Sequence, residues 1–214
     1  MTQKLLSFGD SWPNGAELLP GEQSYGDLIA QNLGLSHKNY SQPGTSIEKL
    51  VLQLKEAIQT EEVKNSLAIF TLTSPTRSMW VDTNCNYREI HVRGEDPVSR
   101  AYYRYMWSDE LDYYRINTIV LALQRMCQQY LISDYYVRGI TNVSLDYPGI
   151  DTSKIYKTSL TELLGCQIPI NSINMDFCVD RQNQYIHPNV CHPNQRGHSR
   201  IATDLYEWIN SINN

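Results

Sequence analysis

A serine near the start of the chain and a histidine near its end are the residues best suited to do chemistry. Ser11 completes a Gly-Asp-Ser tripeptide directly after the short apolar run 5–8, and a glycine there permits a tight turn that points the hydroxyl outward. His192 begins a His-Pro-Asn segment just before an expected helix. A serine hydroxyl becomes nucleophilic when a neighbouring base takes its proton, and histidine titrates in the right range. The two segments together indicate nucleophilic catalysis, although Asp10 and Ser11 could also simply cap a helix.

The elements that must position these residues alternate between strand and helix patterns. Continuous apolar runs predict buried strands, and apolar residues at helical spacing predict amphipathic helices. Strands are expected at 5–8, 37–40, 67–72 and 134–140. Helices are expected at 24–33 (closed by Gly34), 47–58, 98–132, 157–164 and 195–212. The alternation predicts a three-layer α/β/α sandwich with a parallel sheet of about five strands, in which ligands bind at the carboxyl ends of the strands.

The middle of the chain has no recognisable motif. A long polar connection is expected at 76–97, followed by a Tyr-rich helical insertion around 98–132 that is broken near Asp109. The tyrosines and arginines of 100–115 could stack on sugar rings, but tyrosines at helical spacing more often pack on a core. Because the sequence shows no internal repeat and no linker, residues 1–214 are expected to form a single domain.

Charge, hydropathy and cysteine content narrow the possible partners. The chain has 18 basic and 23 acidic residues and a net charge of −5, which argues against a nucleic-acid partner. No apolar run approaches the roughly 18 residues of a membrane span, and the N-terminal apolar stretch is too short for a signal peptide. We therefore expect no membrane partner and a cytoplasmic or virion-associated protein. Five scattered cysteines without a Cys-x-x-Cys pair argue against a disulfide scaffold.

Three segments resemble, in order, the motifs of the SGNH (GDSL-type) hydrolase superfamily. The first is Phe-Gly-Asp-Ser ending at Ser11, and the second is 39–46, with Gly44 in Pro-Gly-Thr-Ser. The last is His-Pro-Asn-x-x-Gly-His-x-x-Ile-Ala, beginning at His192. The resemblance implies a flavodoxin-like α/β/α fold and a serine ester hydrolase. It also implies that Ser11 is the nucleophile, that His192 is the general base, and that the Gly44 N–H belongs to the oxyanion hole.

The third motif of the family departs from its usual form in this chain. The family's Gly-x-Asn-Asp follows the central strand and supplies an asparagine donor to the oxyanion, whereas here Pro75 occupies the asparagine position. Proline has neither a backbone N–H nor a side-chain donor. Ser74, Thr76 or Arg77 could substitute for it. The stretch Thr-Ser-Pro-Thr-Arg is similar to that of a subgroup of SGNH-like proteins from phages and marine bacteria.

The third member of the family's catalytic triad is also altered. The family carries aspartate three residues before the histidine, and here that position is Asn189. Asparagine can orient an imidazole by hydrogen bonding, but it cannot stabilise the imidazolium by charge. We expect Asn189 to orient His192. A Ser–His dyad, or an acid from elsewhere such as Asp176 or Asp180, remains an alternative.

These observations predict an ester hydrolase without a cofactor or metal, acting on a small-molecule or carbohydrate ester. An acetyl group on a carbohydrate is the first candidate substrate, by analogy with the family. The residues expected around the oxyanion and the substrate are Asp10, Gly44, Ser74 and Arg77.

Two other functions compete with hydrolysis. The first is a catalytically impaired SGNH-fold protein that acts as a glycan- or partner-binding module, which the changes at Pro75 and Asn189 would suit. The second is a zinc-binding protein, because histidine and cysteine cluster near the C-terminus. Its ligands would be His187, Cys191, His192 and His198. The zinc site is disfavoured because two prolines stiffen this loop and no carboxylate ligand is evident.

Overall fold

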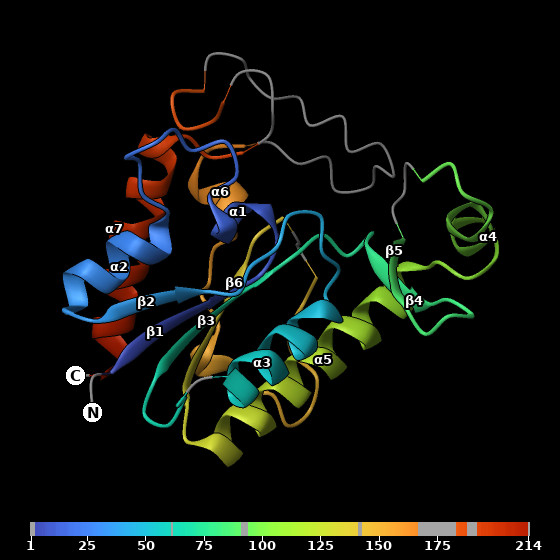
Figure 1. The fold of residues 1–214 in the computed structure, drawn as a ribbon, viewed down its shortest axis with the longest axis horizontal. Coiled ribbons are helices and arrows are strands. Elements are labelled where there is room, and N and C mark those ends of the chain that lie inside the picture. The colour runs from blue at the N-terminus through green and yellow to red at the C-terminus, as the bar shows by residue number, and fades with distance from the viewer. Residues whose placement is uncertain are drawn as a thin grey trace.

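The computed structural model describes residues 3–60, 62–90, 94–140, 143–166, 183–187 and 192–213 (Figure 1). Within these ranges, four parallel strands form one sheet in the order β2-β1-β3-β6. They are β1 (Lys4–Phe8), β2 (Ser36–Asn39), β3 (Leu67–Leu72) and β6 (Ser133–Arg138). The expected α/β/α fold is confirmed, with four strands described where about five were predicted. An isolated parallel bridge between Tyr136 and Ile155 extends the pairing beyond β6.

Helices cover both faces of the sheet, and this explains the continuous apolar runs in its central strands. Helices α2 (Tyr25–Leu33) and α7 (Gln195–Asn213) pack on one face. Helices α3 (Lys49–Thr60) and α5 (Asp109–Tyr130) pack on the other. Successive residues of β1 therefore enter opposite cores, with Leu5 on the α2–α7 side and Leu6 on the α3–α5 side. Figure 1 shows the two helical layers on either side of the strands.

The helix ends follow the expected capping chemistry. Ser24 and Asp27 form a reciprocal capping box at the start of α2, and Gly34 ends this helix in the left-handed conformation. The stretch 98–132 is divided into α4 (Pro97–Tyr105) and α5, with the break directly before Asp109, near which it was predicted. The shorter helices are α1 (Ser11–Asn14), α4 (Pro97–Tyr105), α6 (Leu160–Leu163) and the 3₁₀ turn η1 (Thr152–Lys154).

The segment 76–97 differs from the long connection that was predicted. It contains an antiparallel hairpin of β4 (Ser78–Val81) and β5 (Tyr87–Ile90). Asp82 forms the turn by accepting the backbone N–H groups of Asn84 and Asn86, both at 2.9 Å. The strands are only four residues long and mix polar with apolar side chains, so they show no clear period-2 pattern.

Among the residues that the structure describes, no helix is both long enough and apolar enough to cross a membrane.

Candidate active site

The turn between β1 and α1 brings Ser11 to the carboxyl end of the sheet. Gly9 has φ +148°, and a Cβ at this position would lie 2.5 Å from Pro13 Cγ and 3.0 Å from the Thr71 carbonyl oxygen. Only glycine therefore fits this close approach of the turn to β3. Ser11 follows as the first residue of α1, and it is 5% exposed.

Side chains from α3 and from the loop before it hold the Gly9 backbone in place. The Gln53 side chain accepts the Gly9 N–H and donates to the Gly9 carbonyl, each at 3.0 Å. The Thr45 hydroxyl donates to the same carbonyl at 3.1 Å, which fastens the loop containing Gly44 against the nucleophile turn. Gly44 itself has φ 79°. Gln53 was not predicted as a functional residue. A glutamine between Leu50 and Leu54 on the apolar face of a helix nevertheless indicates a buried polar contact.

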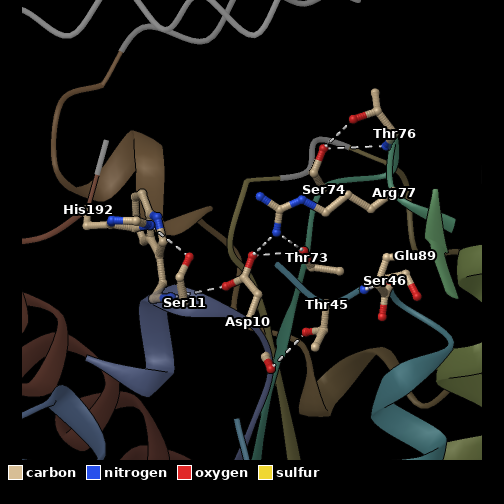
Figure 2. A network of polar contacts seen from close by, with 12 residues as sticks. Asp10, Ser11, Thr45, Ser46, Thr73, Ser74, Thr76, Arg77, Glu89 and His192 are labelled. Carbon is tan, nitrogen blue, oxygen red and sulfur yellow. Dashed lines mark hydrogen bonds and ion pairs between the residues drawn. The ribbon is translucent and has the colours of Figure 1, made fainter. Parts of the chain in front are cut away.

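Ser11 and His192, the two residues predicted from motifs 181 positions apart, lie in contact. The Oγ atom of Ser11 is 2.8 Å from Nε2 of His192 (Figure 2). The histidine precedes α7, and its carbonyl accepts the backbone N–H of His187 at 2.9 Å. Next in the chain, Asn194 accepts the Gly197 N–H at 3.1 Å and so caps α7. A serine hydroxyl within hydrogen-bond distance of an imidazole is the arrangement that general-base activation requires.

Asp10 is buried beside the nucleophile, and its carboxylate binds groups from α1 and from the loop after β3. One carboxylate oxygen accepts the Trp12 N–H at 3.1 Å and caps α1. The other accepts the Thr73 hydroxyl at 2.8 Å and Arg77 Nη1 at 3.0 Å. Figure 2 shows this carboxylate between Ser11 and the Arg77 guanidinium. Arg77 is thereby held at the same end of the sheet as Ser11, with 17% of its side chain exposed.

The loop after β3 is the segment that was compared with the third SGNH motif in the sequence. The Ser74 hydroxyl is buried and lies 2.9 Å from the Thr76 hydroxyl, so these two groups satisfy each other. The Pro75 carbonyl accepts a hydrogen bond from Arg115 of α5. Arg115 also pairs with Glu48 at 3.1 Å and with Asp112 at 2.8 Å, and burial raises the pKa of Asp112 to about 6. These contacts fasten the loop to the helical layer.

The β4–β5 hairpin is fastened to the Gly44 loop. Glu89 of β5 accepts the backbone N–H of Ser46 at 3.0 Å, and its partial burial raises the pKa of this carboxyl (Figure 2). Ser78 of β4 donates to Glu48 at 3.1 Å. The hairpin that the sequence did not predict therefore supports the loop beside the nucleophile.

A carboxylate that the sequence analysis did not identify lies against the histidine. The carboxylate of Glu17, in the loop after α1, contacts Nδ1 of His192, with its oxygen off the axis of an N–H hydrogen bond. Helix α1 ends at Gly15 in the left-handed conformation, and Glu17 itself has φ 66°. Glu17 follows Ser11 by six residues and belongs to no motif. The only sequence signal was an acidic side chain in the loop beside the predicted nucleophile.

The remaining histidine-rich segment is only partly described. Asn189, expected to orient His192, lies outside the described residues, as do the alternative acids Asp176 and Asp180, and this expectation stays a prediction. Cys191, a member of the disfavoured zinc site, also lies outside them. Within the described part of the chain, no group of three histidine, cysteine, aspartate or glutamate residues is placed to hold a metal ion.

His198 has a structural environment. It is fully buried, and its Nδ1 accepts the Tyr25 N–H at the start of α2, at 3.1 Å. Burial lowers the pKa of His198 to about 4, so the ring is neutral at pH 7. This contact joins α7 to α2.

Comparison with known proteins identifies the fold. No family model matches the chain, and no curated protein matches it by sequence. Among solved structures, the psychrotrophic esterase EstA from a Pseudoalteromonas species aligns over 99% of this chain and 100% of its own, with TM-score 0.58 and 12% identity. A member of the lipolytic protein G-D-S-L family from Veillonella parvula aligns over 96% and 97%, with TM-score 0.53 and 12% identity. The chain has the SGNH hydrolase fold.

This result confirms the α/β/α fold that the resemblance of the three motifs implied. A further solved structure, the acetyl xylan esterase Est2A from the rumen bacterium Butyrivibrio proteoclasticus, aligns over 98% of this chain at 11% identity with TM-score 0.51. The alignment covers 64% of that enzyme. The neighbours thus share an esterase fold with this chain, at identities that leave the chemistry to be argued from its own residues.

Proposed function

We propose that this SGNH-fold protein is a serine ester hydrolase, with Ser11 as nucleophile and His192 as general base. The observation that carries the proposal is the 2.8 Å contact between Ser11 Oγ and His192 Nε2 at the carboxyl end of the sheet. Imidazole takes the hydroxyl proton as Oγ attacks the ester carbonyl. The imidazolium then returns this proton to the departing alkoxide. Water, activated by the same ring, hydrolyses the acyl-enzyme and restores the serine.

Hydrogen-bond donors must stabilise the negative charge that develops on the carbonyl oxygen during the attack. The backbone N–H groups of Ser11 and Gly44 are our candidates, supported by the bonds that join the Gly44 loop to the nucleophile turn through Thr45. Arg77 is the better-supported substitute for the asparagine that Pro75 replaces, because its guanidinium is held beside the turn by Asp10. Ser74 is less suited, since its hydroxyl already interacts with Thr76.

The proposed substrate is an acetyl ester of a carbohydrate. The similarity of the fold to an acetyl xylan esterase supports this choice. Exposed aromatic side chains of the hairpin and of α4 offer faces on which sugar rings could stack. They include Tyr87, which is 53% exposed, and Tyr105, which is 73% exposed. An acetylated xylo-oligosaccharide should then be cleaved faster than a long-chain p-nitrophenyl ester, and the reverse preference would contradict this choice.

Turnover of p-nitrophenyl acetate tests the proposed chemistry. Ser11→Ala and His192→Ala should each lower kcat/KM by about 10³-fold or more, with Tm close to that of the wild type. Ser199→Ala is the matched control, because among the described residues the side chain of this exposed serine of α7 bonds only to Gln195 of its own helix, donating to the Gln195 carbonyl at 2.9 Å. Wild-type turnover in Ser11→Ala would remove Ser11 from the mechanism. A folded wild-type protein without turnover would favour the binding-module interpretation.

A further inference from the structure

The loop between α1 and α2 brings a carboxylate to the side of the His192 ring opposite Ser11. Glu17 contacts Nδ1 of the ring, while Nε2 lies 2.8 Å from Ser11 Oγ. A negative charge beside Nδ1 favours the tautomer that carries its proton there. The lone pair of Nε2 then faces the serine hydroxyl, as a general base requires. The carboxylate, the imidazole and the hydroxyl therefore follow one another in the order of a catalytic triad.

The backbone of Glu17 is unfavourable for a glutamate. Its φ of 66° lies in the left-handed region, which disfavours any residue with a Cβ and which glycine or asparagine adopts more easily. Such conformations persist where the surroundings impose them, and they cluster at functional sites. The side chain is 40% exposed, so burial of apolar surface does not explain why a glutamate stands at this position.

Hydrogen bonds hold this loop at both ends. Near its start, the Ala16 N–H donates to the Ser11 carbonyl at 3.1 Å. Near its end, the Gln23 N–H donates to the Gln195 side chain at 2.7 Å, and the Gln195 amide donates back to the Gln23 carbonyl at 3.3 Å. Gln195 is the first residue of α7, three positions after His192. The loop is thus joined to the nucleophile on one side and to the histidine segment on the other, with Glu17 between them.

We propose that Glu17 is the positioning residue for His192, in the role that the SGNH pattern gives to an aspartate three residues before the histidine. The inference rests on the proposed ester hydrolysis. When Nε2 takes the proton from Ser11 Oγ, the ring becomes positively charged, and the Glu17 carboxylate stabilises this charge without taking a proton itself. The neutral amide of Asn189 cannot provide such stabilisation.

Substitutions at Glu17 separate charge from shape. Glu17→Gln keeps the size of the side chain but removes its charge, and should lower kcat on p-nitrophenyl acetate about 10- to 100-fold with KM within about twofold. The loss is smaller than for a buried triad aspartate because water screens this half-exposed carboxylate. Glu17→Asp is shorter but charged, and should retain a higher kcat than Glu17→Gln. Glu22→Gln is the matched control, since this glutamate of the same loop accepts the Leu19 N–H at 2.7 Å and should keep the wild-type kcat.

Glu17→Gly adds a measurement that distinguishes positioning from support of the fold. Glycine relieves the left-handed backbone, so Tm should equal or exceed that of the wild type while kcat falls as in Glu17→Gln. A wild-type kcat in Glu17→Gln, or losses of kcat matched by a lower Tm in every Glu17 variant, would overturn this inference alone. A wild-type protein without turnover would overturn the proposed function and this inference together.

Discussion

At the scale of single residues, the Asp10–Arg77 ion pair defines the environment beside Ser11. Asp10 is 2% exposed and lies within 3.0 Å of Arg77 Nη1, so its charge is balanced inside the protein. When a buried carboxylate loses its cation, the folded protein loses more stability than it would at an exposed pair, because water cannot solvate the buried charge. The aspartate of the Gly-Asp-Ser segment thus contributes to stability, in addition to preceding the serine.

Arg77→Met should therefore destabilise the fold by about 2–4 kcal/mol, measured by urea denaturation. The double variant Arg77→Met/Asp10→Asn should recover most of this loss, since the unpaired charge is then gone. Arg88→Met provides the comparison, because Arg88 pairs with Asp82 at 2.9 Å but is 57% exposed. This variant should lower the free energy of unfolding by less than about 1 kcal/mol. Equal costs for Arg77→Met and Arg88→Met would contradict the account of the buried pair.

At the scale of elements, the packing of α3 against the β1–α1 turn controls the position of the nucleophile. Gln53→Ala should destabilise the protein by about 2–3 kcal/mol, because it leaves the buried Gly9 N–H without its acceptor and opens a small cavity. Turnover should fall as well, since the turn that presents Ser11 loses a support. Gln59→Ala, on the exposed side of the same helix, should change stability by less than about 0.5 kcal/mol. A wild-type unfolding midpoint for Gln53→Ala would show that α3 does not hold the turn.

The contact between α2 and α7 makes stability depend on pH through His198. Its pKa is about 4 in the folded protein, against an ordinary value of 6.5, so between these values the unfolded chain binds a proton that the folded protein excludes. The contribution of His198 to the free energy of unfolding should consequently be fully present above pH 6.5. It should decrease by about 2–3 kcal/mol as the pH falls toward 4.

His198→Asn tests this dependence. The asparagine oxygen can still accept the Tyr25 N–H, but it does not titrate. Urea denaturation at several values between pH 7 and pH 4.5 should give a smaller decrease for this variant than for the wild type. Parallel curves for the two proteins would contradict the assignment of a buried neutral imidazole.

At the scale of the whole molecule, the two hydrophobic cores share one sheet. Adjacent residues of the same strand, such as Ile69 and Phe70, belong to opposite cores, so both cores need the same strands in place in order to form. We therefore propose that the chain unfolds as one cooperative unit. Urea transitions followed by tryptophan fluorescence and by far-UV circular dichroism should coincide. Two separate midpoints would indicate that one part of the chain unfolds independently.

The sequence predicted the parts of this architecture that depend on long apolar patterns. The continuous apolar run of β3 and the helical spacing of apolar residues in α2 predicted these elements directly. The order of the motifs predicted that Ser11 and His192 come together. The β4–β5 hairpin was missed because its short strands lack a clear alternation. Glu17 was missed for a different reason. Its contact with His192 depends on a loop path and a left-handed backbone that no spacing rule encodes.

Labelling by a fluorophosphonate probe shows whether Ser11 is an activated nucleophile. The probe reacts with a serine only when a base increases its nucleophilicity. Mass spectrometry of the labelled wild type should place the adduct on Ser11, and both Ser11→Ala and His192→Ala should remain unlabelled while staying folded. His192→Ala is the decisive variant, because it leaves the serine in place and removes only its partner at 2.8 Å. An adduct on another residue, undiminished labelling in His192→Ala, or no labelling of the folded wild type would show that His192 does not activate Ser11.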